Sequence, residues 1–479
     1  IDLILNPSAS HFAFNKQATR RRIVMEGSRA FGVAYVYANA LGNESGRMIY
    51  DGGTVIASEG RLVAQGQRFS YADYTLTDAV VDVDTNRMLR AQYGSHRPNS
   101  TNDSLRIEVH HPIGDAHPVG PTHELPSWEH SAQLENEEFL RAVSLGLFDY
   151  LRKSRSRGFV LSLSGGADSS TCAILVRALI DLSVAELGFE KAKNKLGMAA
   201  HDATTPGELC HSLLTCVYQS TRNSGDVTRS AAETLAQAIG ARYHEVDVDS
   251  IVQSYRSLAE GALGRALDWE SDDIALQNIQ SRVRAPSVWM LANTTGSLLL
   301  STSNRSEAAV GYATMDGDTS GGLAPVAGID KAFVRAWLRW METDGGDGLE
   351  AYPALASVNE QAPTAELRPA ERKQTDEEDL MPYPVLDTIE GLAIRDKFFP
   401  REVFVTLEAT YPDASAETRL GWVERFFRLW SRNQWKRERY APSFHVDDKN
   451  LDPKTWCRFP ILSAGFEDEL RRLREEVTG

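Results

Sequence analysis

Short apolar runs alternate with helix-like segments along the chain from about residue 134 onward. The apolar runs lie at 158–164, 213–220, 241–249 and 297–303, and the segments with apolar residues at helical spacing lie at 137–154, 169–187 and 226–240. This alternation predicts an α/β fold with a doubly wound, mostly parallel sheet. Because such sheets bind ligands at the carboxyl ends of their strands, we expect the loops after the strands to carry the chemistry.

The first 95 residues show a different mixture of strand-like and turn-like pieces. Strand-like runs lie at 3–10 and 33–42, a helix-like segment at 19–32, a glycine-turned hairpin at 50–66 and a closing segment at 79–87. The chain opens at Ile1 inside a strand-like run, without a basic leader stretch, which indicates a start partway through a domain. We expect an N-terminal unit over 1–112, a linker over 113–133 and a larger domain over 134–479.

Residues 96–133 lack a periodic apolar pattern and are rich in His, Pro, Ser and Asn, which predicts a long loop. The clustered histidines raise the question of a metal site. Their spacing is irregular and no cysteine or second cluster accompanies them, so the sequence disfavours a metal there.

Composition narrows the class of protein. The chain has 479 residues, 42% of them hydrophobic, and 51 basic against 66 acidic residues give a net charge of −15. This acidic balance argues against a nucleic-acid or membrane-surface partner, and no apolar run approaches the roughly 18 residues of a membrane helix. The four scattered cysteines form no CxxC pair and fit a reducing, cytoplasmic location.

The segment "LSLSGGADSS", residues 161–170, joins an apolar run to a helix-like pattern through a turn of small residues. Backbone N–H groups at Ser164, Gly165 and Gly166, together with a helix N-terminus, would form a cradle for a phosphate group. The common nucleotide loop carries a Lys where this loop has Asp168. A carboxylate can hold Mg²⁺ that bridges to phosphate. The loop therefore favours release of pyrophosphate from ATP, as in adenylation, over transfer of the γ-phosphoryl group.

Four further residues follow the last apolar run. Thr302 lies at the carboxyl end of that run, and Glu307 falls in the loop or first helical turn behind it. Asp318 lies in a loop bordered by glycines, and Lys331 follows a short apolar segment. A Thr, two carboxylates and a Lys at this edge of a sheet suit Mg²⁺–pyrophosphate chemistry. Glu307 could share a cation with Asp168, and Lys331 could neutralise the departing oxygens.

The phosphate loop resembles that of the adenine-nucleotide α-hydrolase (PP-loop) family. The blocks "LSGGADSS", "NIQSRVR", "STSNRSEAAVGY", "GDTSGGLAPV", "PTAELRP", "QTDEEDLMPY" and "RNQWKRERYAP", in this order, resemble the glutamine-dependent NAD⁺ synthetase family over nearly the whole chain. The resemblance implies ATP-dependent amidation of nicotinic acid adenine dinucleotide (deamido-NAD⁺) to NAD⁺ through a substrate adenylate, with release of AMP and pyrophosphate. The enzyme would be a ligase that forms a C–N bond.

The resemblance also implies roles for individual residues. Asp168 and Lys331 would be catalytic. Mg²⁺ would be bound by Asp168, Glu307 and Thr364. Thr302 would contact ATP, and the ATP phosphates would be bound by Ser164, Gly165, Gly166, Asp168, Ser169, Ser170 and Lys331. Deamido-NAD⁺ would bind Asn278, Arg282, Tyr312, Asp318 and Lys436. Asn278 and Arg282 are also compatible with an ordinary solvated helix face, and the acidic run after Thr364 with a solvated helix start.

The segment after the second apolar run offers candidates for adenosine contacts. Ser220, Asn223 and Ser224 lie there, and an ordinary N-capping turn explains each of them equally well.

The N-terminal blocks "ILNPSASHFAFNK" and "GQRFSYADYTL" resemble the second half of a nitrilase-type glutaminase domain. Such a domain needs a Cys nucleophile in a "CED"-type block, which this sequence does not contain, and none of its four cysteines is a credible nucleophile. We expect no glutamine hydrolysis by the chain as written, with ammonia coming from glutamine in the full-length parent protein. Ser8 and Ser10 either border the glutamine pocket or are turn residues.

Two other functions stay open at this point. A tRNA-modifying or other PP-loop enzyme would call for a basic RNA-binding surface and often CxxC pairs. A catalytically inert nucleotide-binding module would not require Asp168, Glu307 and Lys331. The expected partners are small molecules (deamido-NAD⁺, ATP, and glutamine or ammonia) and further copies of the chain in a homo-oligomer. Residues 184–208 resemble an insertion whose purpose the sequence does not indicate.

Overall fold

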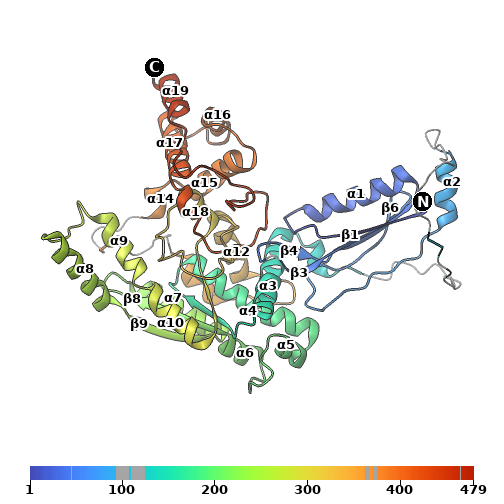
Figure 1. Ribbon diagram of the computed structural model, residues 1–479, viewed down its shortest axis with the longest axis horizontal. Coiled ribbons are helices and arrows are strands. Elements are labelled where there is room, and N and C mark those ends of the chain that lie inside the picture. The colour runs from blue at the N-terminus through green and yellow to red at the C-terminus, as the bar shows by residue number, and fades with distance from the viewer. Residues whose placement is uncertain are drawn as a thin grey trace.

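The larger domain is built on a sheet of four strands, all parallel, in the order β10–β7–β8–β9 (Figure 1). The strands are β7 (Phe159–Ser162), β8 (Leu214–Ser220), β9 (Arg242–Asp247) and β10 (Leu298–Leu300). Each lies inside one of the four predicted apolar runs, so the prediction of a parallel α/β sheet is confirmed. The computed structural model describes all residues except 45, 93–106, 109, 111–123, 362–366, 370–374 and 464.

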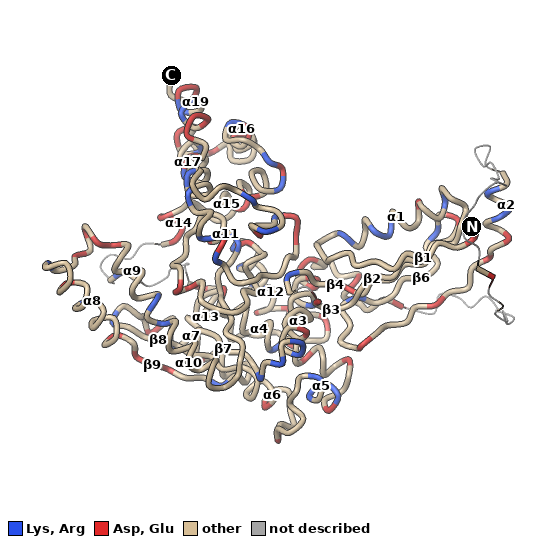
Figure 2. Tube along the Cα trace, in the orientation of Figure 1, with Lys and Arg blue, Asp and Glu red and all other residues tan. Residues whose placement is uncertain are grey.

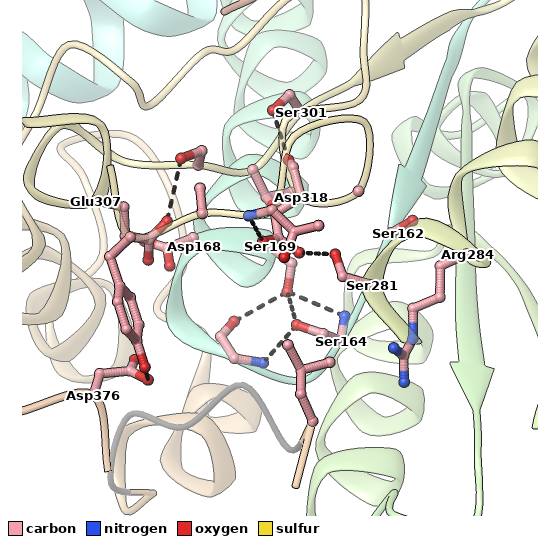
Figure 3. Close-up of a pocket in the computed structure, with 18 of the residues that line it drawn as sticks. Ser162, Ser164, Asp168, Ser169, Ser281, Arg284, Ser301, Glu307, Asp318 and Asp376 are labelled. Atoms are coloured by element: carbon pink, nitrogen blue, oxygen red, sulfur yellow. Dashed lines mark hydrogen bonds between the residues drawn. The ribbon is translucent and has the colours of Figure 1, made fainter. Parts of the chain in front are cut away.

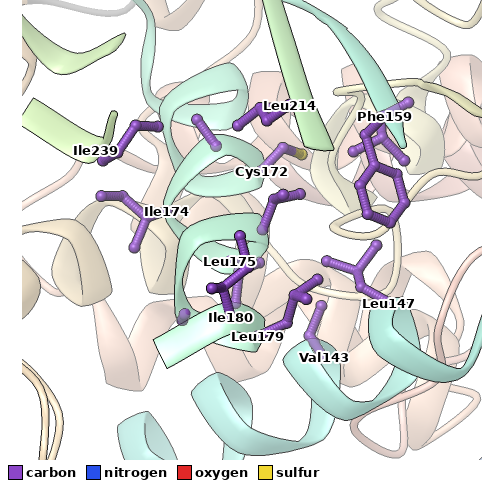
Figure 4. Packing of buried hydrophobic residues seen from close by; sticks show 14 of the residues in the cluster. Val143, Leu147, Phe159, Cys172, Ile174, Leu175, Leu179, Ile180, Leu214 and Ile239 are labelled. Atoms are coloured by element: carbon purple, nitrogen blue, oxygen red, sulfur yellow. The ribbon is translucent and has the colours of Figure 1, made fainter. Parts of the chain in front are cut away.

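Helices cover both faces of this sheet. On one face Phe159 and Leu161 of β7 belong to the core formed with α3 (Leu134–Ser154) and α4 (Ala167–Leu187), as Figure 4 shows for Phe159, Val143 and Leu175. On the other face Val160 packs with residues of α10 (Ala285–Thr295). A strand buried on both faces needs apolar side chains at every position, which is why β7 reads as a continuous apolar run.

Further helices complete this domain. They are α5 (Phe189–Lys195), α6 (Pro206–Leu213), α7 (Asp226–Ile239), α8 (Asp249–Leu263), α9 (Asp273–Arg282), α11 (Arg305–Val310), α12 (Lys331–Thr343) and α13 (Ala356–Asn359). The predicted helices at 137–154, 169–187 and 226–240 correspond to α3, α4 and α7. The helix α7 ends at Gly240 in the left-handed conformation, φ +75°, as the glycine stop predicts.

The N-terminal unit holds a second sheet with the order β1–β2–β5–β6. Its strands are β1 (Leu3–Ser8), β2 (Ala34–Asn39), β5 (Thr54–Ser58) and β6 (Arg61–Gln65), and β1 and β2 are parallel. The helix α1 (Lys16–Phe31) packs on one face through Val24, and the predicted hairpin forms β5 and β6. A two-stranded sheet, β3 (Leu41–Asn43) with β4 (Ile49–Asp51), precedes the hairpin. The closing segment at 79–87 enters a helix, α2 (Val83–Gln92).

The chain after residue 375 forms a helical lobe, which lies at the top of Figure 1. It comprises α14 (Asp376–Asp379), α15 (Tyr383–Glu390), α16 (Pro400–Thr410), α17 (Ala416–Arg432), α18 (Gln434–Arg437) and α19 (Glu467–Thr478). Its apolar core is separate from that of the sheet and includes Ala309 and Val310 of α11. In the described part of the chain, no helix is both long and apolar enough to cross a membrane.

Residues 184–208, the unexplained insertion, contact the N-terminal unit. The Lys195 ammonium donates to the Tyr71 carbonyl oxygen at 2.9 Å and to Asp73 at 2.8 Å. The Glu186 carboxylate accepts from the Tyr71 backbone N–H at 2.8 Å, and the Tyr71 ring packs edge-on against Phe148 of α3. The segment therefore clamps the stretch that follows β6 against the larger domain.

A buried guanidinium joins the two units more firmly. Arg68, just after β6, pairs with Glu129 and with Glu138 of α3, both at 2.6 Å, and all three side chains are at most 5% exposed. The guanidinium also lies over the Trp128 ring, 5.0 Å from its centroid. A charge this deeply buried is tolerated only because its partners are in place.

We expect Arg68→Met to lower the free energy of unfolding by about 3–5 kcal/mol, because it leaves two buried carboxylates without their counter-charge. Urea denaturation followed by tryptophan fluorescence measures the change. The control is Arg61→Met, an exposed arginine of β6, which should change the stability by less than about 0.5 kcal/mol. Equal stabilities of the two variants would contradict the role assigned to the Arg68 pairs.

Candidate active site

A cavity of about 640 Å³ opens beside the carboxyl ends of β7, β8 and β10 (Figure 3). It is lined by the loop after β7, the loop after β10, parts of α9 and α12, and residues of the helical lobe. Of the residues predicted from sequence, Ser164, Gly166, Asp168, Ser169, Ser224, Asn278, Thr302, Glu307, Tyr312, Asp318, Lys331 and Lys436 line it. These residues span more than 270 positions of the sequence, from Ser164 to Lys436, and the tertiary structure brings their side chains to one edge of the parallel sheet, as expected.

The predicted phosphate loop opens α4. Gly165 has φ +81°, and a Cβ atom there would lie 2.2 Å from the Thr228 carbonyl oxygen, so only glycine fits. The Ser169 hydroxyl lies 3.1 Å from that of Ser164 and donates to the Gly166 carbonyl oxygen at 3.1 Å. Gly166 is the N-cap residue of α4 and provides no side-chain cap, which leaves N–H groups of the first turn available to an anion.

Two members of the predicted loop face elsewhere. The Ser170 side chain is buried and its hydroxyl donates to the Gly166 carbonyl oxygen at 2.8 Å, and neither Ser170 nor Gly165 lines the cavity. Both hold the shape of the loop in this structure. The predicted contacts of these two residues with ATP stay predictions.

An ion pair between two loops forms the charged centre of the cavity. The Lys331 ammonium, at the start of α12, pairs with Asp168 and lies 3.7 Å from Glu307. Burial lowers the pKa of Lys331, but the charges of Asp168 and Glu307 outweigh it and raise the pKa above its usual value. Burial and the charge of Asp168 raise the pKa of Glu307 to about 8. Two carboxylates thus share one ammonium in the ligand-free site.

Capping bonds fix where these groups stand. The Asn304 side chain caps α11 by accepting from the Glu307 N–H at 3.0 Å and donates to Asp168 at 3.1 Å. Asp330 caps α12 in the same way through the Phe333 N–H at 2.7 Å. The two helix starts therefore determine where the Glu307 and Lys331 side chains lie.

A fully buried arginine ties the two helix starts together. Arg305 donates to Asp330 at 2.9 Å, to Glu390 at 3.1 Å and to Asp447 at 2.5 Å, and it also donates to the Gly328 carbonyl oxygen at 2.8 Å. Arg305 precedes Glu307 by two residues and Asp330 precedes Lys331 by one. The separation between the carboxylate and the ammonium is thus set by a network that reaches into the helical lobe.

Four of the five residues predicted to bind the dinucleotide line the same cavity. Asp318 accepts from Ser281 at 2.5 Å, and Asn278 accepts from Thr314 at 2.8 Å. Tyr312 donates to Asp379 at 2.8 Å, and Lys436 donates to the Gly311 carbonyl oxygen at 2.6 Å. Arg282 is the exception among the predicted set: it donates to the Met315 carbonyl oxygen at 2.9 Å and does not line the cavity.

Of the three candidates for adenosine contacts, one lines the cavity and two do not. Ser224 lines the cavity, whereas the Asn223 amide donates to Gln280 at 3.0 Å. Ser220 ends β8, does not line the cavity, and its carbonyl oxygen accepts from the Val248 N–H at 2.9 Å. Thr364, the third predicted metal ligand, lies outside the described residues.

Sequence reasoning missed one buried carboxylate of the site. Asp376 lines the cavity, is 7% exposed and accepts hydrogen bonds from Tyr383 at 3.3 Å and Tyr312 at 3.4 Å. Burial raises its pKa. The acidic run starts a helix, α14, capped by Thr375, as predicted, but it is not wholly solvated, because Asp376 and Asp379 line the cavity. Nothing in the sequence of the run distinguishes Asp376 from the acidic residues that follow it.

The donor set suits Mg²⁺ only together with a phosphate ligand. Among the described residues no group of three or more His, Cys, Asp or Glu side chains could hold a metal ion. Asp168 and Glu307 supply two carboxylates close to one ammonium. Mg²⁺ is commonly bound by one or two carboxylates, with the remaining positions filled by substrate phosphates and water. The residues present therefore fit a metal that arrives with ATP.

Comparison with known proteins decides the family. The NAD synthase family model matches residues 139–439. A glutamine-dependent NAD(+) synthetase of Oryza sativa subsp. indica is 33% identical, over an alignment that covers 100% of this chain and 68% of the rice protein. This chain belongs to the glutamine-dependent NAD(+) synthetase family. The family predicted from the sequence motifs is confirmed.

Solved structures of the synthetase family agree with this assignment. The crystal structure of a glutamine-dependent NAD(+) synthetase from Cytophaga hutchinsonii is 44% identical with a TM-score of 0.79, and the match covers 98% of this chain and 70% of that chain. The synthetase from Acinetobacter baumannii is 20% identical with a TM-score of 0.53, covering 96% and 68% of the two chains, and shares the fold.

The raised pKa of Glu307 leads to a prediction for stability. An unfolded glutamate has a pKa of about 4.3, so between that pH and about 8 the ligand-free folded protein binds a proton that the unfolded chain releases. Glu307 therefore makes its full contribution to stability below pH 4.3, and this contribution is lost as the pH rises through 8. We expect the stability of Glu307→Gln to fall less steeply than that of the parent protein between pH 6 and 8.

Urea denaturation at several pH values, without ATP or divalent cations, measures this difference. Glu417→Gln is the control, because Glu417 stands in the first turn of α17 as Glu307 does in α11 but is exposed. Its pH profile should parallel that of the parent. Parallel profiles for Glu307→Gln and the parent would contradict the raised pKa.

Proposed function

We propose that this chain catalyses the ATP-dependent amidation of deamido-NAD⁺ to NAD⁺. The nicotinate carboxylate attacks the α-phosphorus of ATP, the bond to the β-phosphate oxygen breaks, and pyrophosphate leaves. Ammonia then attacks the carboxyl carbon of the adenylate, and AMP leaves to give the amide. This is the reaction expected of a ligase that forms a C–N bond, and family membership supports it.

The observation that carries the proposal is the pairing of the phosphate loop with the Lys331 ion pair in one cavity. The N-terminus of α4 and the ammonium provide positive potential where the departing diphosphate needs it. Ser164, Gly166 and Ser169 supply donors beside it. Asp168 and Glu307, with Thr364, would hold the Mg²⁺ that accompanies the phosphates, and the ion would neutralise charge on the pyrophosphate.

The dinucleotide occupies the remaining part of the cavity in this proposal. Asn278, Tyr312, Asp318 and Lys436 would contact deamido-NAD⁺, and Thr302 and Ser224 would contact ATP. The cavity volume of about 640 Å³ is in the range of sites that enclose a nucleotide-sized ligand. Arg282 would not contact the dinucleotide directly. It would position the loop before Asp318 through its hydrogen bond to the Met315 carbonyl oxygen.

Residues 1–112 form the second half of a nitrilase-type glutaminase domain in this proposal, 113–133 the linker, and 134–479 the synthetase domain. Glutamine is then the nitrogen source of the full-length parent, and this chain uses ammonia. Ser10 lies in a polar cluster that fits either role open from the sequence: its backbone N–H donates to Asn39 at 2.9 Å, and its carbonyl oxygen accepts from Arg20 at 2.7 Å.

The surface supports small-molecule substrates and self-association rather than nucleic acid. Basic and acidic positions are interspersed along the described chain (Figure 2), unlike the basic stripe of a nucleic-acid-binding protein. The helix α8 exposes several apolar side chains, among them Tyr255 and Leu258. We propose that the chain forms a homo-oligomer and that this helix takes part in the contact, since exposed apolar side chains are common at protein interfaces.

The direct test mixes the protein with ATP, Mg²⁺, deamido-NAD⁺ and ammonium chloride, followed by separation of the nucleotides. We expect NAD⁺, AMP and pyrophosphate in equal amounts. ADP in place of AMP would contradict the adenylation chemistry, and binding of ATP without any NAD⁺ would identify an inert nucleotide-binding module.

We expect Asp168→Asn to reduce the turnover in this assay by about tenfold or more, because it weakens the coordination of Mg²⁺ and releases the Lys331 ammonium. Asp226→Asn is the matched control: Asp226 opens α7, the helix after the neighbouring strand, and its side chain is 88% exposed. A parental rate for Asp168→Asn would remove this carboxylate from the mechanism.

A further inference from the structure

One stripe of α12 faces the interior of the domain. Lys331, Val334 and Leu338 lie on it and are at most 5% exposed, while Arg339, two turns after Lys331, is exposed. Arg335 stands on the buried stripe, four residues after Lys331, and is half-buried. Positions four apart share a helix face, so the two cations point the same way about one turn apart.

Arg335 lines the same cavity as the Lys331 ion pair. Val358, Asn359 and Gln361, in and just after α13, line this cavity as well. The Asn359 amide donates to Glu342 of α12 at 2.8 Å, which holds α13 against this helix. Arg335 is therefore part of a cavity wall to which both α12 and α13 contribute.

The other cations of the cavity are already bonded to the protein. Lys331 pairs with Asp168, Lys436 donates to backbone carbonyl oxygens, Arg284 donates to the Gln280 carbonyl oxygen at 2.7 Å, and Arg368 pairs with Asp273 and Asp379 at 3.1 Å. No hydrogen bond or ion pair joins Arg335 to any residue that the structure describes. A half-buried guanidinium has five donors to satisfy, so its position in a cavity wall points to an anionic ligand.

We propose that Arg335 binds the β- and γ-phosphates of ATP and the pyrophosphate that leaves. This rests on the proposed function of the site. When the nicotinate oxygen bonds to the α-phosphorus, the bond from that phosphorus to the bridging oxygen breaks, and its electron pair stays on the pyrophosphate. Arg335 donates to non-bridging oxygens of this dianionic or trianionic group, a geometry that the planar guanidinium matches with two parallel hydrogen bonds.

The test uses Arg335→Gln, which removes the charge and leaves a shorter polar side chain, and Arg335→Lys, which keeps the charge but not the planar fork. Arg339→Gln is the matched control, because Arg339 stands one turn further along α12, is exposed and does not line the cavity. Calorimetric titration with inorganic pyrophosphate and Mg²⁺ measures binding. Steady-state rates with ammonium as the nitrogen source give kcat/KM for ATP and KM for deamido-NAD⁺.

We expect Arg335→Gln to weaken pyrophosphate binding and to lower kcat/KM for ATP, each by about 10- to 100-fold, the range for a hydrogen bond to a charged group. The KM for deamido-NAD⁺ should stay within twofold of the parent value, which a general distortion of the site would not preserve. Arg335→Lys should recover part of the affinity. Pyrophosphate affinity of Arg335→Gln equal to that of Arg339→Gln would overturn the proposal.

Two further outcomes are distinguishable. If the parent protein binds pyrophosphate but makes no NAD⁺, the proposed function fails, and the titration still decides the role of Arg335. If Arg335→Gln does not fold, as judged by its thermal melting, the titration of Arg335→Lys decides. A loss of threefold or more supports the bidentate contact, and unchanged affinity overturns it.

Discussion

A buried ammonium between two carboxylates is the interaction on which the site depends. Lys331, Asp168 and Glu307 come from the starts of three helices, α12, α4 and α11, and each start is fixed locally by a capping residue or a glycine turn. An ionised side chain that is buried without a partner of opposite charge carries a large desolvation cost. The pairing of the Lys331 ammonium with Asp168, together with the raised pKa of Glu307, keeps this buried group of side chains close to neutral.

The helical lobe takes part in the same electrostatic arrangement. Arg305 reaches from α11 to Glu390 and Asp447 of the lobe and to Asp330 at the start of α12. The lobe also contributes Asp376 to the cavity. A change in the packing of the lobe would therefore alter the separation of the charged groups, which couples its stability to the shape of the site.

The N-terminal unit is attached by charge as much as by apolar contact. Arg68 between Glu129 and Glu138, and the clamp formed by Glu186 and Lys195, hold the stretch after β6 on the larger domain. The β5–β6 hairpin itself turns at Glu59 and Gly60, which both have positive φ. The unexplained segment at 184–208 thereby acquires a structural role, as part of the contact between the two units.

Several features followed from local sequence alone. The strands β7 to β10, the glycine stop after α7, the phosphate loop and the ordered set of motifs could be read directly, since apolar periodicity and turn chemistry are properties of neighbouring residues. The family followed from the same motifs. In contrast, the acidic run gave no reason to separate Asp376 from its neighbours, and Ser170 and Ser220 looked equivalent to the serines that line the cavity.

Only the tertiary structure decided which of these polar residues meet. It turned Ser170 and Arg282 away from the cavity, placed Asp376 in it and left Arg335 without a partner among the described residues. The physical reason is that burial and charge pairing depend on contacts between helices far apart in the sequence, such as that of Asp168 with Lys331, 163 residues later. The sequence determined the elements and their chemistry, whereas long-range packing determined which side chains share one cavity.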